Sequence, residues 1–464
     1  MIKITSENVN NIRCRYDNRL SATYYNLAQQ IESLNKQGVE VYSVSDICSS
    51  IDSGSYIDTY VEDGTRYIRV GDLKKYVVDM SESAFIPSTK VKNKMVLSKG
   101  DICFARTQAT FDKLGNFTLI DELNAGDSIS QHISKIRPQN SVSSEYLVAY
   151  LNSKFGKKQM CIASYGDTRV ELTHNQTKEI KIVLLDKHII SQVEEKVKEM
   201  LTCNNSANSA FQKSQEIIDR EFYNSEHSSS LMITTKQMLI ENDLWSPICY
   251  APRYTETVNR IKSEFQYKLL SELVLPIKKG VEVGSENYLI ELEKNQESLP
   301  FVRTSDIYNH EIDYSPDYFV MSEIAQKNKC PDIRTDDIIF SKDGKIGEVG
   351  IVNKDDSMVP SSGYAILRTN NTLSCNYLFA ILSHKEIVKN QAKMKTVIAA
   401  TIPHLKIEKM KDFYIPIFPE NVISEIETHI VSFRENIKRK QELDIEIQKI
   451  LNGNYERLFN YKNV

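Results

Sequence analysis

Hydrophobic and polar positions follow two different rhythms along this chain. Residues 40–140 and 268–370 carry short runs of β-branched and aromatic residues between Gly, Asp, Asn and Ser. This pattern is typical of twisted, loop-rich sheets. Towards the end of each half, apolar residues recur at helical spacing instead. The pattern predicts an α+β fold with two sheet-containing regions, each followed by a long helix.

The same order of sequence segments occurs twice along the chain. Arg69 and Asp72 match Arg303 and Asp306, and His174 is expected to occupy the position of His404. The matching segments are residues 19–25 and 244–250, 67–73 and 301–307, 100–106 and 336–342, 146–151 and 377–382, and 189–194 and 422–427. Five matches in the same order exceed what chance supplies, so we predict two similar domains related by an approximate twofold axis.

Two stretches have the spacing of a coiled-coil seam. The first seam is formed by Val193, Val197, Met200, Asn204, Ala207, Phe211, Ser214 and Ile218. The second is formed by Ile423, Ile426, Ile430, Phe433 and Ile437, slips in phase at residues 438–440, and resumes at Leu443, Ile447 and Ile450. We predict that the two helices pair antiparallel. The alternatives are that each helix packs on its own domain, or that the small residues 204–210 interrupt the first helix.

Composition narrows the classes of partner. The chain has 464 residues, is 41% hydrophobic and 26% charged, and has a formal net charge of −4. A uniformly basic nucleic-acid binder is thereby excluded, and a polyanion would have to meet a local basic patch. The eight cysteines form no Cys-x-x-Cys pair, which favours reduced thiols over a metal site. With no apolar stretch of membrane-spanning length and no signal peptide, a cytoplasmic protein without a membrane partner is expected.

Motifs for catalysis are missing. A methyltransferase acting on amino groups would need a Gly-rich loop after its first strand and an Asn/Asp-Pro-Pro-aromatic turn, and neither is present. Gly344-Lys345-Ile346-Gly347 lacks the spacing of a phosphate-binding loop and predicts a tight hairpin. Short acidic patterns such as Asp336-Asp337 with Lys342 are too common to indicate a nuclease. We therefore predict no catalytic residue and no metal site.

Polar residues recur instead at strand ends and turns in matched places. Arg can pair with guanine O6 and N7, Gln with adenine N6 and N7, and Lys with phosphates. The candidate DNA-contacting residues are Arg66, Arg69, Arg106, Thr107, Gln108, Tyr165, Thr168, Arg169 and His174 in the first half, and Arg303, Thr304, Lys342, Asp343, Lys345, Lys395, Thr396 and His404 in the second. Any one of them could be an ordinary solvated loop residue, and their recurrence is what favours a shared role.

The doubled plan, with its Arg-x-x-Asp-Leu/Ile and Gly/Asp-Asp-Ile-x-Phe-x-Arg/Lys segments, resembles the specificity subunits of type I restriction-modification systems and related type II specificity subunits. The resemblance covers nearly the whole chain. It implies two target recognition domains that read the halves of a bipartite DNA site, with paired helices as the spacer. The implied limits are residues 1–185 for the first recognition domain, 186–226 for the central spacer helix, 227–416 for the second recognition domain and 417–464 for the C-terminal spacer helix.

The same resemblance implies the partners. Such subunits bind double-stranded DNA and two modification subunits, and S-adenosylmethionine is bound by those methyltransferase subunits rather than by the specificity chain. Type I assemblies also add motor-nuclease subunits. The half-sites should be unlike in sequence, because Arg106-Thr107-Gln108 stands where the second half has Lys342-Asp343-Gly344.

The sequence departs from the family pattern in both halves. Asp336 stands where the family usually has Gly, and Ala105-Arg106-Thr107-Gln108 stands where a Ser-Arg-x-Gly turn is common. Two other classes of function remain open on the residues alone. One is a self-contained DNA methyltransferase or nuclease with unrecognised motifs, and the other is a repeat scaffold that binds only protein.

Overall fold

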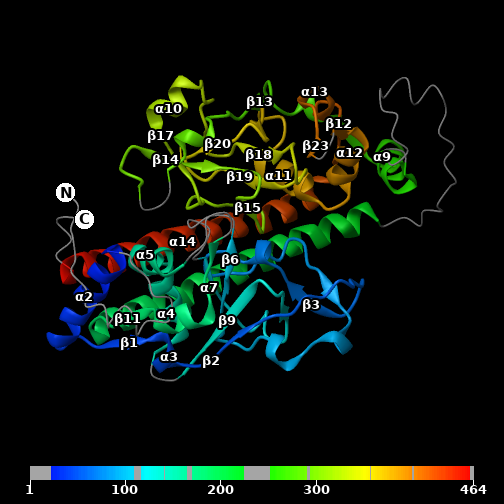
Figure 1. Ribbon diagram of the computed structural model, residues 1–464. Coiled ribbons are helices and arrows are strands. Elements are labelled where there is room, and N and C mark those ends of the chain that lie inside the picture. Colours follow the sequence, from blue (N-terminus) through cyan, green and yellow to red (C-terminus); the bar gives the residue numbers. More distant parts are fainter. Residues whose placement is uncertain are drawn as a thin grey trace. The chain divides into compact units, whose positions relative to one another are not determined.

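The computed structural model describes residues 22–108, 116–139, 142–164, 170–223, 251–289, 293–355, 357–399 and 402–459. The chain forms two compact units. Unit 1 comprises Met1–Thr202 and Lys440–Val464, and unit 2 comprises Cys203–Arg439. Each unit therefore takes a part of both long helices, α7 (Lys187–Phe222) and α14 (Glu420–Leu458). Figure 1 labels many of these elements.

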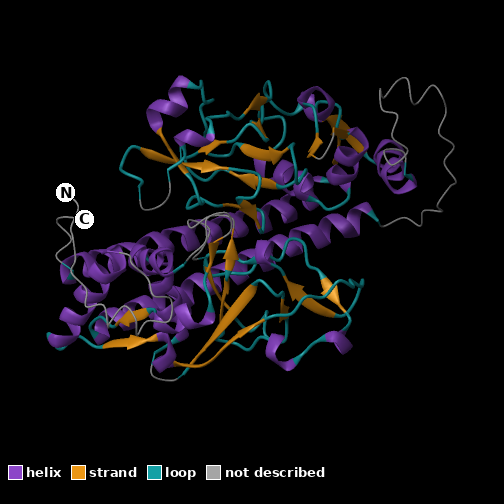
Figure 2. Ribbon diagram, viewed as in Figure 1, coloured by secondary structure: helices purple, strands orange, loops and turns teal. Residues whose placement is uncertain are grey.

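Unit 1 combines short strands with helices (Figure 2). Besides the long helices, its helices are α2 (Ala22–Lys36), α3 (Val44–Ile47), α4 (Ser144–Asn152), α5 (Lys154–Ala163) and α6 (His174–Glu179), with 3-10 turns at Val70–Asp72, Ser88–Lys90 and Asn93–Met95. Its strands are β1 (Val41–Ser43), β2 (Cys48–Ser53), β3 (Thr65–Ile68), β4 (Phe85–Ile86), β5 (Ile102–Ala105), β6 (Thr107–Gln108), β7 (Phe117–Leu119), β8 (Ser128–Ile129), β9 (Ile133–Pro138), β10 (Val170–Glu171) and β11 (Lys181–Val183).

Unit 2 repeats the plan. Its helices are α9 (Pro252–Glu264), α10 (Ser322–Lys327), α11 (Cys375–Ser383), α12 (Ile387–Lys395) and α13 (Ile407–Met410), with 3-10 turns at Leu270–Glu272 and Ser285–Asn287. Its strands are β12 (Gln266–Leu269), β13 (Lys278–Lys279), β14 (Ser298–Val302), β15 (Ile307–Tyr308), β16 (Glu311–Ile312), β17 (Phe319–Met321), β18 (Ile338–Ser341), β19 (Val349–Ile351), β20 (Val359–Pro360), β21 (Tyr364–Leu367), β22 (Val397–Ala399), β23 (Ile402–His404) and β24 (Tyr414–Ile417).

The two units share one sheet topology. The four-stranded sheet has the order β2-β9-β5-β7 in unit 1 and β13-β21-β18-β19 in unit 2. The three-stranded sheet has the order β4-β3-β8 in unit 1 and β17-β14-β20 in unit 2, and its β3–β8 and β14–β20 pairs are both parallel. The pairs β1–β11 and β12–β24 also correspond. The predicted internal repeat and the α+β class are confirmed.

Buried side chains repeat as well. The hydroxyl of Tyr146 on α4 donates to the carbonyl oxygen of Val183 at 3.0 Å, and that of Tyr377 on α11 donates to Pro416 at 2.9 Å. Both tyrosines are fully buried within their units. A buried phenol needs a hydrogen-bond partner. Each tyrosine therefore links its helix to the corresponding strand of its unit, β11 in unit 1 and β24 in unit 2.

The long helices confirm the predicted seam. In unit 2, Phe211 of α7 packs on Phe433 of α14 with ring centroids 5.5 Å apart, and Arg220 pairs with Glu425 at 3.3 Å. Residue numbers rise along one helix as they fall along the other, so the helices are antiparallel in this unit. In unit 1, Lys196 of α7 pairs with Glu446 of α14. The helices therefore pair with each other and do not pack only on their own domains.

The details of the seam refine the prediction. The tract 204–210 lies inside α7 and does not interrupt it. The polar positions Asn204 and Ser214 are buried, as expected for seam residues. At the phase slip Lys440 is buried, and after Leu443 and Ile447 the next buried position is Leu451 rather than Ile450. Of the repeated segments, residues 19–21 and 244–250 lie outside the described residues, and the side chains of residues 22–25 are not described.

Candidate nucleic-acid interface

One turn in each unit is held by the same backbone frame. In unit 1, the N–H of Arg106 donates to the carbonyl oxygen of His132 at 2.9 Å, and its carbonyl accepts the N–H of Leu172 at 2.9 Å. In unit 2, Lys342 makes the same two bonds with Gly363 and Leu405, each at 2.8 Å. We call residues 106–108 the unit 1 turn and residues 342–345 the unit 2 turn. The predicted equivalence of the two basic residues is confirmed.

The same frame shows that the predicted equivalence of His174 and His404 is wrong. Leu172 corresponds to Leu405, so Glu171 takes the position of His404. Glu171 lies opposite Thr107 in the β6–β10 pair, and His404 lies opposite Asp343. His174 instead begins α6, as Ile407 begins α13. Strand pairing decides which residues of the two units correspond. The shared residue type of His174 and His404 is misleading, because His174 lies three positions after Glu171.

The unit 1 turn carries a partly exposed guanidinium. Nη1 of Arg106 lies 3.7 Å from the carboxylate of Glu171. Its Nε is buried and has no hydrogen-bond partner among the described residues. Thr107 is buried, and Gln108 is placed by its backbone opposite Val170. Arg106 thus keeps donor capacity beyond its one distant ion pair.

His174 is held inside unit 1 next to this turn. Its Nε2 lies 2.8 Å from the hydroxyl of Ser53 and 3.1 Å from that of Ser134. Burial lowers the pKa of His174, and the like charges of Arg106, Lys178 and Lys94 lower it further. The ring of His174 thus links Ser53 at the end of β2 to Ser134 of β9. The exposed Lys94 and Lys178 were missed by the sequence reasoning because neither lies in a repeated motif.

The unit 2 turn is a charge cluster. Nζ of Lys342, whose side chain is only 3% exposed, lies 2.7 Å from the carboxylate of Asp343. That carboxylate also contacts Nδ1 of His404. Thr304 lies against the same turn, since a Cβ placed on Gly363 would be 2.8 Å from the Thr304 methyl group and 3.8 Å from Cβ of Asp343. The structure therefore brings together Thr304, Lys342, Asp343 and His404.

Lys345 lies further along this hairpin. Its Nζ is 3.5 Å from the carboxylate of Glu348, which is 1% exposed and also pairs with Lys389 at 3.3 Å. Two lysines thus share one buried carboxylate, and one positive charge is left in excess. The unit 2 turn consequently presents a polar surface with net positive charge at the end of β18.

The repeated Arg-x-x-Asp segment has a local structural role. The backbone N–H groups of Arg69 and Arg303 each donate to the aspartate three residues later, Asp72 or Asp306, at 2.8 Å. These bonds cap a tight turn after β3 and β14. The Arg69 side chain also bonds Asp72 and is 43% exposed.

The other predicted arginines are more enclosed. Arg303 pairs with Asp317 at 3.1 Å and stacks over the Tyr318 ring at 4.4 Å. Arg66 lies 3.4 Å from Asp127, and burial raises the pKa of that carboxyl to about 6. Each of these two arginines is paired with a carboxylate of its own unit, so their positions have a structural explanation that needs no DNA contact.

The remaining predicted residues are dispersed. Nζ of Lys395 donates to the carbonyl oxygen of Asp412 at 3.3 Å, and the hydroxyl of Thr396 donates to that of Ala392 at 2.7 Å. Tyr165, Thr168 and Arg169 lie outside the described residues. Among the described residues, no group of three or more His, Cys, Asp or Glu side chains is placed to hold a metal ion.

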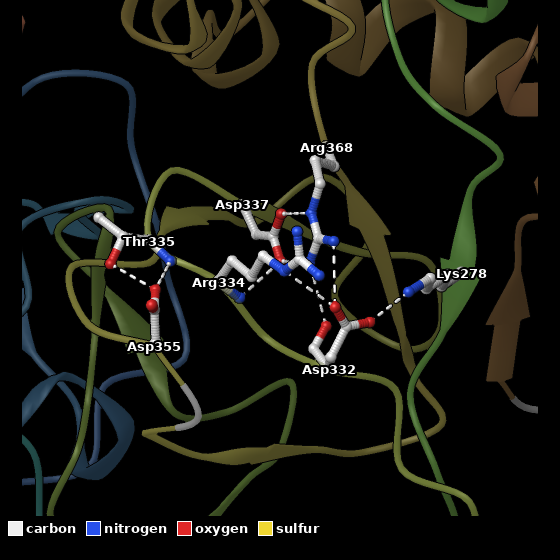
Figure 3. A network of polar contacts seen from close by, with 7 residues as sticks. All are labelled: Lys278, Asp332, Arg334, Thr335, Asp337, Asp355 and Arg368. Carbon is white, nitrogen blue, oxygen red and sulfur yellow. Dashed lines mark hydrogen bonds and ion pairs between the residues drawn. The ribbon is translucent and has the colours of Figure 1, made fainter.

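A buried carboxylate anchors the opposite end of β18 (Figure 3). Asp337 accepts two bonds of 2.7 Å from Arg368, and it also accepts the backbone N–H of Arg334 at 2.9 Å. Arg368 further contacts Asp332 at 3.2 Å. Around this core, Lys278 and Arg334 also contact Asp332, and Thr335 bonds Asp355. The hydrogen bond from Lys278 is the main reason why the pKa of Asp332 is lowered.

The same anchor exists in unit 1 between Asp101 and Arg137, again with two bonds of 2.7 Å. It explains why aspartate recurs in the repeated Asp-Ile-x-Phe segment, a reason that sequence reasoning missed. The residue before it has a positive φ in both units, +86° at Gly100 and +74° at Asp336. Asp336 replaces the expected glycine, and its carboxylate lies 2.6 Å from Arg434 of α14.

Comparison with known proteins finds a family match for part of unit 2. Residues 274–449 match the family model described as the type I restriction modification DNA specificity domain. The match begins just before β13 and ends within α14, so it includes the unit 2 turn and the Asp337 anchor. No curated protein matched the chain.

Solved structures of similar proteins come from the same class. The S subunit of a type I restriction-modification system from M. genitalium is 12% identical, over 90% of this chain and 96% of that chain, with a TM-score of 0.38. The HsdS subunit from Thermoanaerobacter tengcongensis is 16% identical, over 92% of this chain and 97% of that chain, with a TM-score of 0.29. The assignment rests on the family match and not on these likenesses.

The matched residues correspond to a DNA specificity domain. Unit 1 repeats the sheets, anchor and turn of unit 2. Residues 274–449 therefore resemble the DNA specificity domains of type I restriction-modification systems. A self-contained methyltransferase or nuclease is not favoured. No helix in the described ranges is long and apolar enough to cross a membrane.

Proposed function

We propose that this subunit recognises a bipartite, asymmetric DNA site, one half through each unit. The observation that carries the proposal is the shared backbone frame around Arg106 and Lys342, which presents different side chains in the two units. Because the backbone hydrogen bonds around the two turns are the same, we expect both units to present their turns to a DNA duplex in the same orientation. Different side chains give them different base preferences, because each base pair offers its own donor and acceptor pattern in the major groove.

The partners follow from the class. Double-stranded DNA is the ligand, and two modification subunits carry S-adenosylmethionine and the methyl-transfer chemistry. Motor-nuclease subunits complete a restricting assembly. We assign the two recognition domains to residues 1–185 and 227–416 and the spacer helices to 186–226 and 417–464. A protein that acts on chromosomal DNA in this way works in the cytoplasm of its cell.

Single-molecule methylome sequencing tests the proposal. A host strain with the intact reading frame is compared with a strain that lacks only this frame, the neighbouring genes being left in place. We expect a two-part motif with a constant unread gap to lose its methylation on deletion. An unchanged methylome, with the modification subunits shown to be expressed, would refute the assignment of this chain as their specificity subunit.

The protein-binding scaffold predicts a different result. It requires that the purified full-length assembly shows no preference between the methylated motif and a scrambled duplex. Fluorescence anisotropy measurements with both duplexes at one salt concentration distinguish the two hypotheses, because only a subunit that recognises a DNA sequence binds one duplex more tightly than the other.

A further inference from the structure

Unit 2 carries a basic and aromatic surface that is linked to its turn. We define this lysine–tyrosine surface by Lys262 of α9, Lys395 of α12, Lys409 of α13, Tyr267 of β12 and Tyr414 of β24. Nζ of Lys262 lies 4.3 Å above the Tyr414 ring, and the Tyr267 ring meets Tyr414 edge-on at 5.3 Å. Tyr267 is 41% exposed.

The elements that carry these residues are firmly held together. The side chain of Gln391 on α12 accepts the N–H of Tyr414 at 2.7 Å and donates to its carbonyl oxygen at 2.9 Å. Asn390 of α12 donates to the hydroxyl of Thr257 on α9 at 2.9 Å. The surface is therefore a preformed part of the domain.

Positive charge is in excess here. Residues 393–412 contain five lysines and two acidic residues, Glu408 and Asp412. The corresponding residues 161–179 of the first half contain one lysine and one arginine against three acidic residues. Burial lowers the pKa of Lys395, and the like charges of Lys409 and Lys262 add to this effect while Asp412 opposes it. Like charges held together in this way favour an anionic partner.

The surface is connected to the unit 2 turn through a short segment. The β22–β23 hairpin leads from Lys395 to His404, which lies opposite Asp343 of the turn. The next residue, Leu405, donates its N–H to the carbonyl of Lys342, and α13 with Lys409 follows directly. The segment that carries Lys409 is thus tied by backbone hydrogen bonding to the unit 2 turn.

Building on the proposed function, we propose that the lysine–tyrosine surface binds phosphates of the DNA backbone beside the half-site read by unit 2. Lysine is a compact point charge suited to phosphate contact without sequence preference. Unit 2 would then add sequence-independent affinity to the base contacts made by its turn.

The test compares two double variants of the full-length chain in its assembly. Lys262→Gln/Lys409→Gln removes two charges of the surface. Lys327→Gln/Lys354→Gln removes two exposed lysines elsewhere in unit 2 and serves as the matched control. Lys327 lies on α10. Lys354 follows β19, which pairs with β18, and it lies near the start of β18, whereas the unit 2 turn follows the end of that strand. Thermal unfolding checks that both variants fold.

The measurement is the dissociation constant for the target duplex and for a scrambled duplex over a series of KCl concentrations. Each lost phosphate contact lowers the slope of log affinity against log salt by about 0.9. We expect the surface variant to lose about 2 units of slope on both duplexes equally, while the control keeps the wild-type slope and both variants keep the preference for the target.

An unchanged slope in the surface variant overturns the inference and leaves the proposed function standing. If the same variant instead loses its modification subunits, the surface binds protein and the inference is equally wrong. A wild-type assembly with no preference for the target would refute the proposed function, while the slope on the scrambled duplex would still decide whether the surface binds phosphates.

Discussion

Asp337 and Arg368 form a bidentate pair in which a fully buried carboxylate accepts two hydrogen bonds of 2.7 Å from one guanidinium. The pair joins the start of β18 to the chain just after β21, and Asp101 with Arg137 does the same in unit 1. Such a planar fork sets geometry as well as energy. It holds the central strand whose other end carries the unit 2 turn.

Removal of Arg368 should therefore destabilise unit 2. Arg368→Ala leaves a buried charge without its partner, and losses of about 3–5 kcal/mol are typical of that change. Arg137→Ala in unit 1 should cost less, because the Arg137 side chain is 39% exposed and that of Arg368 is 22% exposed. Chemical denaturation followed by fluorescence and circular dichroism measures both. Equal, small losses would show that the fork is not an anchor.

Asp127 should make the stability of unit 1 depend on pH. Burial raises its folded-state pKa to about 6, above the usual value near 4 of an unfolded chain. Between these values the folded state holds a proton that the unfolded state has released, so this group's contribution to stability falls as pH rises from about 4 to 6. The whole effect amounts to about 3 kcal/mol.

Asp127→Asn removes that titration. The difference in unfolding free energy between the wild type and this variant should therefore shift against the wild type as pH rises through the window, and then stay constant. Denaturation curves of both proteins at several pH values give the difference directly, with all other titrating groups cancelling. Parallel pH profiles would contradict the prediction.

Substitutions at position 336 should show how much the left-handed backbone conformation there lowers the stability of unit 2. Asp336→Ala and Asp336→Gly both lose the ion pair to Arg434, but only glycine adopts a φ of +74° without strain. The glycine variant should be about 1 kcal/mol more stable than the alanine variant. Gly100→Ala in unit 1 should lose more than this, because its φ is +86° and the added Cβ would lie 3.1 Å from the Ser144 hydroxyl. Equal stabilities of the two position-336 variants would argue against strain there.

Arg106 should affect one half of the recognised site. Replacement by Gln removes a guanidinium that is 31% exposed in the turn, and a lost bidentate base contact costs about 1–3 kcal/mol of discrimination. Methylome sequencing of a strain carrying Arg106→Gln should show relaxed sequence in one half of the motif, with the other half and the gap unchanged. Glu122→Gln, at an exposed position paired with Lys99, is a control that should leave the motif intact. Relaxation in both halves would refute the assignment of the turn to one half-site.

The sequence by itself determined the doubled α+β plan, because strands and helices leave periodic patterns that survive even where few residues are identical. It also determined the antiparallel seam of α7 and α14, since seam spacing is a local property of each helix. Even the equivalence of Arg106 and Lys342 followed, because each ends a short apolar strand that is easily recognised.

The tertiary structure decided which side chains are available. In the sequence, Lys342 resembles an exposed loop cation, but its side chain is only 3% exposed in the fold. Lys395 donates to the carbonyl oxygen of Asp412, a group that only folding brings near. The false match of His174 with His404 arose because residue identity was followed where strand pairing decides. The forks at Asp101 and Asp337, and the surface around Tyr414, join residues from separate elements. Such contacts depend on how the strands and helices pack, which spacing along the chain does not encode.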